Sequence, residues 1–600
     1  MSAPNPELVE SSATTEGVPV APSLAGAIEN VRVPLERARI DARVVTISLI
    51  AIGPAAITAV VAQVLVAIIA VVTNFAFYGR WSAQNVSPSH HHLGWLVLFV
   101  PAIGGIIVGL MARYGSKAIR GHGIPEAMEQ VLLNDSRIPP RMMFLKPVSA
   151  AISIGTGGPF GAEGPIIATG GAMGSVFGQV LRTTAMERKT LLAAGAAAGM
   201  AATFGSPVAA VLLAIELLLF ELRPRSIVPV ALAASTATAV RIAFHGVGPA
   251  IAMPRLGTPT EGALAAYVIL GALIGCLSVY VTRFVYWIED LFEHLPIHWM
   301  WWPAIGGLIV GAVGIVAPRT LGIGYENLDD LVSGKLLGMT ALTLCLFKFI
   351  SWSFSLGSGT SGGTLAPLFT IGGGCGAALG GFAAQALPRY HIDVRICALV
   401  GMAAMFAGAS RALLASVVFA FEITLQPLGL LPLLGGCTAG YLMSSLLMRN
   451  TIMTEKLARR GVRVPSEYAA DHLELVTVGD VCTHDVVTVH ADDRVGALHA
   501  LRETHQGFPV VNAEGQLVGV VTRRDFLARA KDEDVRIGAL VTRVPSVIFP
   551  DNSLRDAADH MVRENVGRLP VVSRENPREL VGIITRSDLL RAHERRLQQA

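Results

Sequence analysis

A single carboxylic acid, Glu163, stands in a glycine-rich stretch between two apolar segments, residues 155–165. Glycine lets the backbone leave a helical path, and Pro165 suits the first turn of a helix, where no N–H group is missed. The sequence therefore predicts that a helix begins here. Because the first N–H groups of a helix lack internal partners and carry the positive end of its dipole, such a start can bind an anion. Glu163 is a candidate functional acid, and the alternative is an ordinary first-turn glutamate.

A stretch of the same kind recurs in the second half of the chain. Gly161 and Pro165 recur as Gly363 and Pro367, 202 residues later, and the run Gly-Met-Ala-Ala that starts at Gly199 recurs at the same separation. The chain thus contains two related halves. Broken apolar helices at corresponding positions of two repeats indicate a substrate site between the repeats, where helix N-termini face an anionic group.

Three glycine-proline loops follow one another along the chain: Gly121-His122-Gly123-Ile124-Pro125, Gly161-Ala162-Glu163-Gly164-Pro165 and Gly363-Thr364-Leu365-Ala366-Pro367. They resemble the anion-binding loops GSGIP, GxEGP and GxFxP of the CLC family of chloride channels and chloride/proton exchangers. The resemblance extends from Arg43 to the C-terminus. It implies an all-α polytopic membrane protein built of two inverted-topology repeats with broken helices, followed by a C-terminal α/β module.

By this resemblance, Glu163 is the gating residue of an anion pathway. Its ionised carboxylate competes with the anion for a site, and its protonation removes that block. Backbone N–H groups of the three loops replace the water around the anion, because burying an unpaired charge costs several kcal/mol or more. The resemblance also implies a homodimer with one pathway per subunit and an interface around residues 207–243 and 413–447.

Three positions depart from the family pattern. His122 stands where a serine coordinates the central anion, Leu365 where phenylalanine is usual, and Met453 where a coordinating tyrosine is expected. Chloride is the expected ion, with related small anions as the alternative. The charge of His122 can change near neutrality, so this residue is expected to tune anion preference or pH sensitivity.

A fourth departure concerns protons. Family exchangers place a second glutamate directly after the position of Glu216, where this chain has Leu217. Glu221 lies four residues further, on the same face of a continuing helix, and is a candidate for the proton path. The competing expectation is that Glu221 pairs with Arg225 at the membrane edge. The sequence therefore predicts weak or absent proton coupling, with a proton-coupled chloride antiporter as the alternative.

Two further acids, Glu216 and Glu422, occupy matching places in the two halves. Each lies nine residues after the start of its apolar segment, at Pro207 and Leu413 respectively. Acids that deep in a membrane need partners. We expect them to bond to backbone groups rather than to carry ions.

The composition supports a membrane protein with a soluble appendix. Of 600 residues, 52% are hydrophobic and only 15% are charged, and the net charge is +3. The chain has no basic run of the kind that would predict a nucleic-acid partner. The six cysteines lack the spacing of a zinc site or redox motif, and no metal site is expected. The chain shows no nucleophile-base pair, so an enzyme is not predicted.

Five segments are predicted along the chain. They are a disordered tail at 1–27, a membrane domain at 28–461 with halves at about 43–245 and 262–461, a linker at 462–475, and two small domains at 476–531 and 532–593. Arginines before the apolar run at 44–72 predict a cytoplasmic N-terminus by the positive-inside rule. A plasma-membrane protein with its C-terminal domains in the cytoplasm is therefore expected.

The C-terminal part has its own repeat. A strand pattern ending in Thr522 and followed by Asp525 recurs with Thr585 and Asp588, and helical patterns at 494–504 and 554–564 alternate with the strands. This part resembles a tandem CBS pair. The resemblance implies that these four residues hold the ribose of an adenosine nucleotide, ATP, ADP or AMP; the alternative is a structural pair that binds none.

CBS pairs also occur on magnesium transporters, so a CBS-regulated cation transporter is the alternative from another class. A cation path needs carboxylates or rings of carbonyls. In the glycine loops the only acid is Glu163, among helix starts that favour anions. The loops therefore favour an anion pathway.

Overall fold

The computed structural model describes residues 32, 42–462, 464, 473, 476–498, 506–528 and 534–599. The tail predicted at 1–27 and most of the linker lie outside these residues. The chain divides into two compact units, residues 43–468 and a second unit that joins residues 1–42 to 469–600. Each unit is described by itself.

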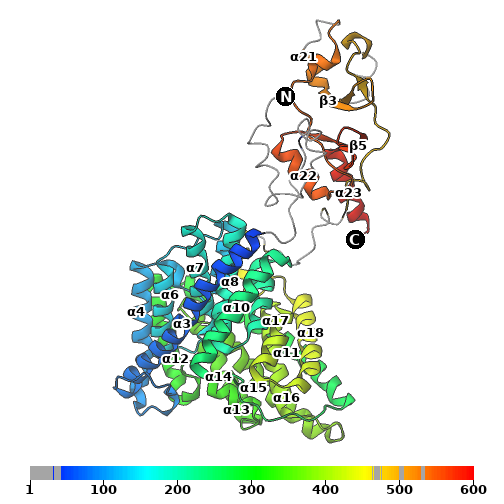
Figure 1. The fold of residues 1–600 in the computed structure, drawn as a ribbon. Coiled ribbons are helices and arrows are strands. Elements are labelled where there is room, and N and C mark those ends of the chain that lie inside the picture. Colours follow the sequence, from blue (N-terminus) through cyan, green and yellow to red (C-terminus); the bar gives the residue numbers. More distant parts are fainter. Residues whose placement is uncertain are drawn as a thin grey trace. The chain divides into compact units, whose positions relative to one another are not determined.

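The first unit is a bundle of helices (Figure 1). Its first half comprises α3 (Ala42–Tyr78), α4 (Val100–Tyr114), α5 (Ile124–Leu133), α6 (Met142–Gly155), α7 (Glu163–Val180), α8 (Ala185–Phe204), α9 (Pro207–Ala214) and α10 (Pro224–His245). Its second half comprises α11 (Glu261–Glu293), α12 (Trp302–Val316), α13 (Tyr325–Val332), α14 (Gly338–Gly357), α15 (Leu365–Ala386), α16 (Val394–Ser410), α17 (Leu413–Thr424) and α18 (Leu430–Leu447), and α19 (Glu455–Arg459) follows. The helices of the two halves correspond in order.

Within the described residues of this unit, eight helical segments are long and apolar enough to cross a membrane. The longest of the first half, α3, contains the run predicted at 44–72. Four others, α6, α16, α17 and the segment Pro207–Leu219, are apolar but shorter. Short helices between full spans are what the sequence predicts for the broken segments, and the all-α polytopic fold is confirmed.

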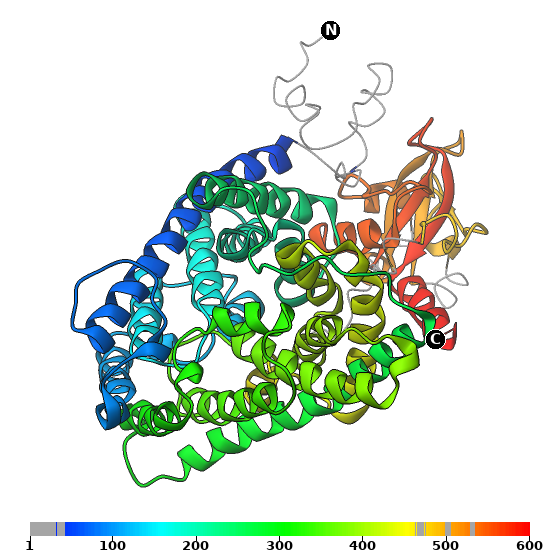
Figure 2. The ribbon, with the colours of Figure 1, turned by 90° about the horizontal axis from the view of Figure 1, so that it is seen from below.

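The helices of the two halves lie side by side (Figure 2), and α4 and α12 pack against each other through glycine. In α4, a Cβ atom added to Gly105 would overlap the carbonyl of Pro303, and in α12 one added to Gly307 would overlap the carbonyl of Pro101. The two contacts are equivalent, since each glycine and each proline recurs 202 residues later. Small residues at these crossings let the backbones of membrane helices approach closely.

The helix breaks lie where the sequence predicts them. The chain leaves α6 at Gly155, turns with Gly157 at a φ of 101°, and enters α7 at Glu163. The second half repeats this path from α14 into α15, which begins at Leu365. Glu163 and Leu365 are therefore equivalent first residues of two helices.

The second unit is an α/β module with an internal repeat. Its elements are β1 (Val489–His490), β2 (Gly507–Val511), β3 (Leu517–Thr522), α21 (Arg523–Ala528), α22 (Leu554–Arg563), β4 (Arg568–Val572), β5 (Leu580–Thr585) and α23 (Arg586–Gln599). Strands β2 and β3 form one antiparallel hairpin, and β4 and β5 form another. A parallel neighbour joins each hairpin, at Val489 beside Val510 and at Ile548 beside Val571.

Two predicted helices of this unit have different outcomes. The helix predicted at 554–564 is confirmed as α22. The one predicted at 494–504 lies partly outside the described residues, and its described part contains a 3-10 turn, Val495–Leu498.

Arg32 belongs to the second unit, although the sequence assigned residues 28–461 to the membrane domain. Its N–H donates to the Pro545 carbonyl at 2.9 Å, and its own carbonyl accepts from Val547 at 2.8 Å. Its guanidinium donates to Glu564 at 2.6 Å and holds the pKa of that carboxyl below its usual value. These partners lie more than 500 residues away in sequence, so no local pattern could indicate them.

Candidate functional site

Three helix N-termini meet because the loops before them pair through their backbones. Gly161 and Gly363 exchange two hydrogen bonds, with N···O distances of 3.2 and 2.9 Å. The N–H of Gly121 donates to Thr360 at 3.3 Å, and its carbonyl accepts from Gly362 at 3.4 Å. The three predicted loops are thus brought together, and α5, α7 and α15 start close to one another.

These loops approach so closely that only glycine fits at several positions. A Cβ atom on Gly164 would overlap the carbonyl of His122, and one on Gly123 would meet the Gly164 carbonyl. Gly123 also has a φ of 95°, which side chains other than glycine's rarely tolerate. Glycine at these positions therefore keeps three helix starts within one small region.

The Glu163 side chain folds back over this meeting point and is fully buried. Its Oε1 accepts a hydrogen bond from the Tyr325 hydroxyl at 2.6 Å. Its Oε2 lies beside Gly161 and Gly363, where a Cβ atom would contact it, and has no hydrogen-bond partner among the described residues. The backbone N–H of Ala366 also faces this carboxyl, from the first turn of α15. A carboxylate therefore sits where three helix dipoles favour negative charge.

Tyr325 comes from a fourth loop that the sequence analysis missed. The residues Gly322-Ile323-Gly324-Tyr325 repeat Gly121-His122-Gly123-Ile124 at a separation of 201, and each run starts a helix. The repeated glycines were the available signal. The proline that marks the other loops is replaced here by Glu326, which hid the match.

Two buried lysines hold the first and fourth loops in the same way. Lys146 donates to the carbonyls of Ile119 and Gly121, both at 2.8 Å. Lys348, 202 residues later, donates to the carbonyls of Thr320 and Gly322 at 2.9 and 2.8 Å. Ionisable groups so deep in a membrane protein are costly and need such partners. The lysines therefore fix both loops.

The three unusual positions are also buried in this region. His122 is 6% exposed, and its Nδ1 has no hydrogen-bond partner among the described residues. Leu365 and Met453 are also buried, at 3% and 0% exposed. Neither of these two side chains can donate a hydrogen bond. The hydroxyls that the family pattern places at the positions of His122 and Met453 are therefore absent.

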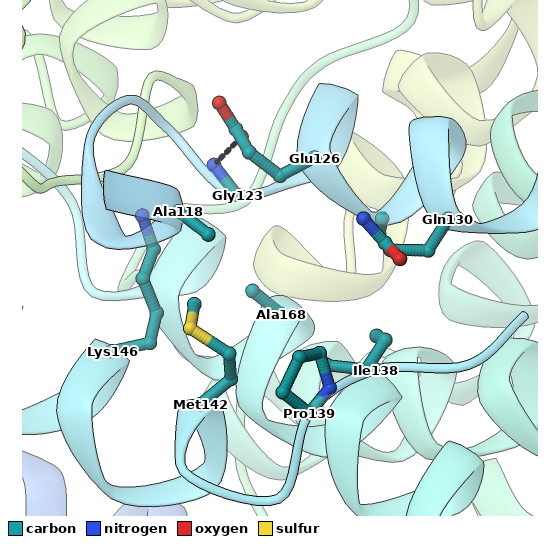
Figure 3. A pocket seen from close by; sticks show the side chains of 10 residues that line it. Ala118, Gly123, Glu126, Gln130, Ile138, Pro139, Met142, Lys146 and Ala168 are labelled. Atoms are coloured by element: carbon teal, nitrogen blue, oxygen red, sulfur yellow. Dashed lines mark hydrogen bonds between the residues drawn. The ribbon is translucent and has the colours of Figure 1, made fainter. Parts of the chain in front are cut away.

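A small cavity of about 50 Å³ lies beside the first loop (Figure 3). Glu126 and Lys146 are on its wall, and Glu126 accepts from the N–H of Gly123 at 2.7 Å. The carboxylate of Glu126 is also paired with Lys456 at 2.9 Å. Such a volume holds only a few water molecules. We assign the cavity no separate ligand.

Glu216 and Glu422 bond to the backbone, as the sequence predicts. The carboxylate of Glu216 accepts from the N–H groups of Leu414 and Ala415 at 3.0 Å each. That of Glu422 accepts from Val208 and Ala209 at 3.1 and 2.8 Å. Each half therefore satisfies the first N–H groups of a helix in the other half, α17 or α9.

The expected placement of Glu221 is wrong. The helix that contains Leu217 passes into a π-turn, Ile215–Leu219, and Phe220 is left-handed with a φ of 53°. Glu221 therefore lies in a loop and is not one helical turn beyond Leu217. It accepts from Ser226 at 2.5 Å and lies 3.8 Å from the Arg223 guanidinium, rather than pairing with Arg225.

The candidate nucleotide residues form two identical local motifs. Asp525 Oδ2 accepts from the N–H and hydroxyl of Thr522 at 2.8 and 2.5 Å. Asp588 Oδ2 accepts from the same groups of Thr585 at 2.8 and 2.6 Å. One oxygen of each carboxylate therefore stabilises the strand-to-helix turn, and the other oxygen of Asp588, Oδ1, lies 3.6 Å from the Arg591 guanidinium.

The chain matches the model of a family described as "Voltage gated chloride channel" over residues 103–445, and that of the CBS domain over residues 478–532 and 537–595. It is 30% identical over 373 residues to the "Putative chloride channel protein ClcB-like" of Ralstonia nicotianae, covering 61% of this chain and 86% of that protein. It is 30% identical over 398 residues to the "H(+)/Cl(-) exchange transporter ClcA" of Salmonella arizonae, covering 64% of this chain and 82% of that protein.

A solved structure has the same fold. The "slow cyanobacterial Cl-/H+ antiporter" superposes with a TM-score of 0.61 at 23% sequence identity, over 68% of this chain and 98% of that one. Inverted repeats with broken helices are typical of transport proteins, and helix N-termini that meet inside the membrane favour an anionic group. The chain belongs to the CLC family of chloride channels and transporters and carries a CBS pair. Such proteins are not enzymes, and the cation-transporter alternative is not supported.

One prediction concerns Glu216, one of the two backbone-bonded acids. Glu216→Gln should lower the free energy of unfolding by about 1–3 kcal/mol, because hydrogen bonds from two N–H groups lose a charged acceptor. The pH dependence of anion flux should stay as in the unchanged protein, because this carboxylate is committed to α17. Thermal melting in detergent and flux from liposomes measure both. Glu261→Gln, at the exposed start of α11, is the matched control; a changed pH profile in Glu216→Gln alone would contradict the structural role.

Proposed function

We propose that this protein moves chloride, or a related small anion, across a membrane through a pathway gated by Glu163. The observation that carries the proposal is the fully buried Glu163 carboxylate at the meeting point of α5, α7 and α15. A carboxylate and a small anion have the same charge and need the same donors. The carboxylate therefore occupies the place of the ion, and the pathway is closed while it remains there.

The candidate anion-binding groups are mainly backbone N–H groups within 121–125, 161–165 and 363–367, apart from those of Gly121, Gly123, Gly161 and Gly363, which donate within the loops. Such donors replace hydration water without a full positive charge that would trap the ion. His122, Leu365 and Met453 line or support the same region and leave selectivity among small anions open to these side chains. A related structure is described as a "CLC-type fluoride/proton antiporter", so anion preference varies within this fold.

We propose weak or absent proton coupling. Leu217 is 4% exposed and cannot relay a proton, and Glu221 lies outside the helix and beside Arg223. The competing function, a proton-coupled chloride antiporter, is favoured by relatives described as H(+)/Cl(-) exchange transporters. A proton would then have to reach Glu163 through water rather than through a second glutamate.

Three further assignments belong to this proposal. The protein works as a homodimer with α9, α10, α17 and α18 at the interface, as the resemblance to the family implies. Its N-terminus and CBS pair lie in the cytoplasm, and the membrane is the plasma membrane. The CBS pair binds ATP, ADP or AMP through Thr522, Asp525, Thr585 and Asp588.

The gating role is tested with Glu163→Gln. Anion flux through the unchanged protein should rise as the pH falls, because a protonated carboxyl releases the site, and the variant should conduct at every pH. Flux from liposomes over about pH 4 to 8 spans the ordinary range of carboxyl and histidine titration. Glu261→Gln should retain the pH dependence. A Glu163→Gln protein with the unchanged profile would end the assignment.

Proton coupling is tested by imposing a chloride gradient on liposomes at equal internal and external pH. We expect little or no uphill proton movement, and no effect of Glu221→Gln on it. Robust pumping that Glu221→Gln abolishes would make Glu221 the internal proton acceptor and refute the proposal. Pumping that survives the change would also refute weak coupling and would indicate a water path to Glu163.

Nucleotide binding is tested by calorimetry on the full-length protein in detergent. ATP, ADP or AMP should release heat that Asp525→Ala and Asp588→Ala together remove. Asp480→Ala is the matched control. Asp480 accepts from the N–H and hydroxyl of Thr477 in the same local geometry, but it does not belong to the two repeated strand-to-helix turns. No heat at millimolar nucleotide, or equal loss in the control, would favour a structural pair.

A further inference from the structure

The contact between Tyr325 and Glu163 joins the two halves of the membrane unit at the candidate gate. Tyr325 is the first residue of α13, and its hydroxyl donates to Glu163 Oε1 at 2.6 Å. Its ring packs edge-to-face on Phe204 with centroids 5.7 Å apart, and Phe204 packs in the same way on Phe419 at 4.9 Å. Packed aromatic rings hold the hydroxyl in a fixed place.

A donor that binds the gate carboxylate is chemically suited to the ion that replaces it. Both are small anions that accept charge-assisted hydrogen bonds. We propose that the Tyr325 hydroxyl is an anion-binding group of the pathway: it holds the Glu163 carboxylate while the gate is closed and the transported anion once the carboxylate moves away. This inference rests on the proposed function and adds a residue that the three loops do not contain.

The side chains around the site support this assignment. Two positions where the family pattern places hydroxyl donors hold His122 and Met453, and methionine has no donor. Tyr325, from the fourth loop, brings a hydroxyl to the Glu163 carboxylate. Among the described residues, no other side chain is recorded as a hydrogen-bond donor to Glu163.

Among the described residues, the other titratable side chains near Glu163 make no hydrogen bond to it. Lys348 on α14 acts on the carboxyl through its charge, but its amine donates to Thr320 and Gly322. From α15, residues 364–367 present no titratable side chain. From the loop before α5, the carbonyl of His122 lies against Gly164 while its Nδ1 remains without a partner. Tyr325 is therefore the group whose removal changes the hydrogen bonding of Glu163 most directly.

The experiment measures chloride binding by calorimetry on the purified full-length protein in the Glu163→Gln background, where the competing charge is gone. Adding Tyr325→Phe should weaken chloride binding about tenfold, because the phenylalanine ring keeps its place on Phe204 but lacks the donor. Tyr267→Phe is the matched control: Tyr267 is a buried membrane tyrosine whose oxygen accepts from the N–H of Asp393 at 3.0 Å, away from the site. Removal of the Tyr267 hydroxyl should leave chloride affinity unchanged.

A second readout uses the protein with Glu163 intact. Tyr325→Phe should move the half-maximal pH of anion flux upward, because the ionised carboxylate loses the donor that favours it. Incorporation of 3-fluorotyrosine at position 325, which has a more acidic hydroxyl, should tighten chloride binding and move the half-maximal pH downward. The two changes are expected to shift the half-maximal pH in opposite directions. If Tyr325→Phe fails to fold, the 3-fluorotyrosine protein still tests the proposal.

The outcomes separate the two proposals. If Glu163→Gln alone binds no chloride and carries no flux, the proposed function fails, and the role of Tyr325 fails with it. If Glu163→Gln binds chloride but neither Tyr325 change alters the affinity or the pH profile, the proposed function stands and this inference is overturned. An equal loss of affinity in Tyr267→Phe would also overturn it, because a general loss of packing would then explain both results.

Discussion

The exchange of two backbone hydrogen bonds between Gly161 and Gly363 is the contact on which the candidate site depends. Both residues lie at interrupted helices, where N–H and carbonyl groups have no helical partners and no water is at hand. Each loop supplies the hydrogen-bond partners that the other lacks. Gly121 extends this pairing by bonding to Thr360 and Gly362, on either side of Ser361. The first N–H groups of a helix have no partner within it, and those of α5, α7 and α15 face this meeting point. They are left for an anion because the loops have satisfied one another.

The same exchange between halves stabilises the surroundings of the site. Glu216 binds the start of α17 and Glu422 binds the start of α9, so each half completes a helix of the other. At the crossing of α4 and α12, Gly105 and Gly307 allow each backbone to touch the other. Neither half can satisfy these groups alone. The site is therefore a property of the paired repeats, and a single repeat would leave buried donors unpaired at a cost of about 1–3 kcal/mol each.

The sequence indicated those features that depend on local backbone chemistry. Glycine and proline located the helix starts, and matching spacings gave the repeats and the backbone-bonded Glu216. Three features escaped because they depend on distant or irregular geometry. Tyr325 lies in a loop without the marker proline, Glu221 follows a π-turn that periodicity cannot reveal, and Arg32 pairs with residues at the far end of the chain.

The chemistry of the site arises where the two halves differ. The position equivalent to Glu163 is Leu365, and the position equivalent to Tyr325 is Ile124. A symmetric pair of acids would place two like charges in one buried region, which is strongly unfavourable. A symmetric pair of leucines would leave no group to compete with an anion. The meeting point therefore has one acid from the first repeat and one hydroxyl from the second that donates to it, while the surrounding glycines, lysines and helix starts remain nearly symmetric.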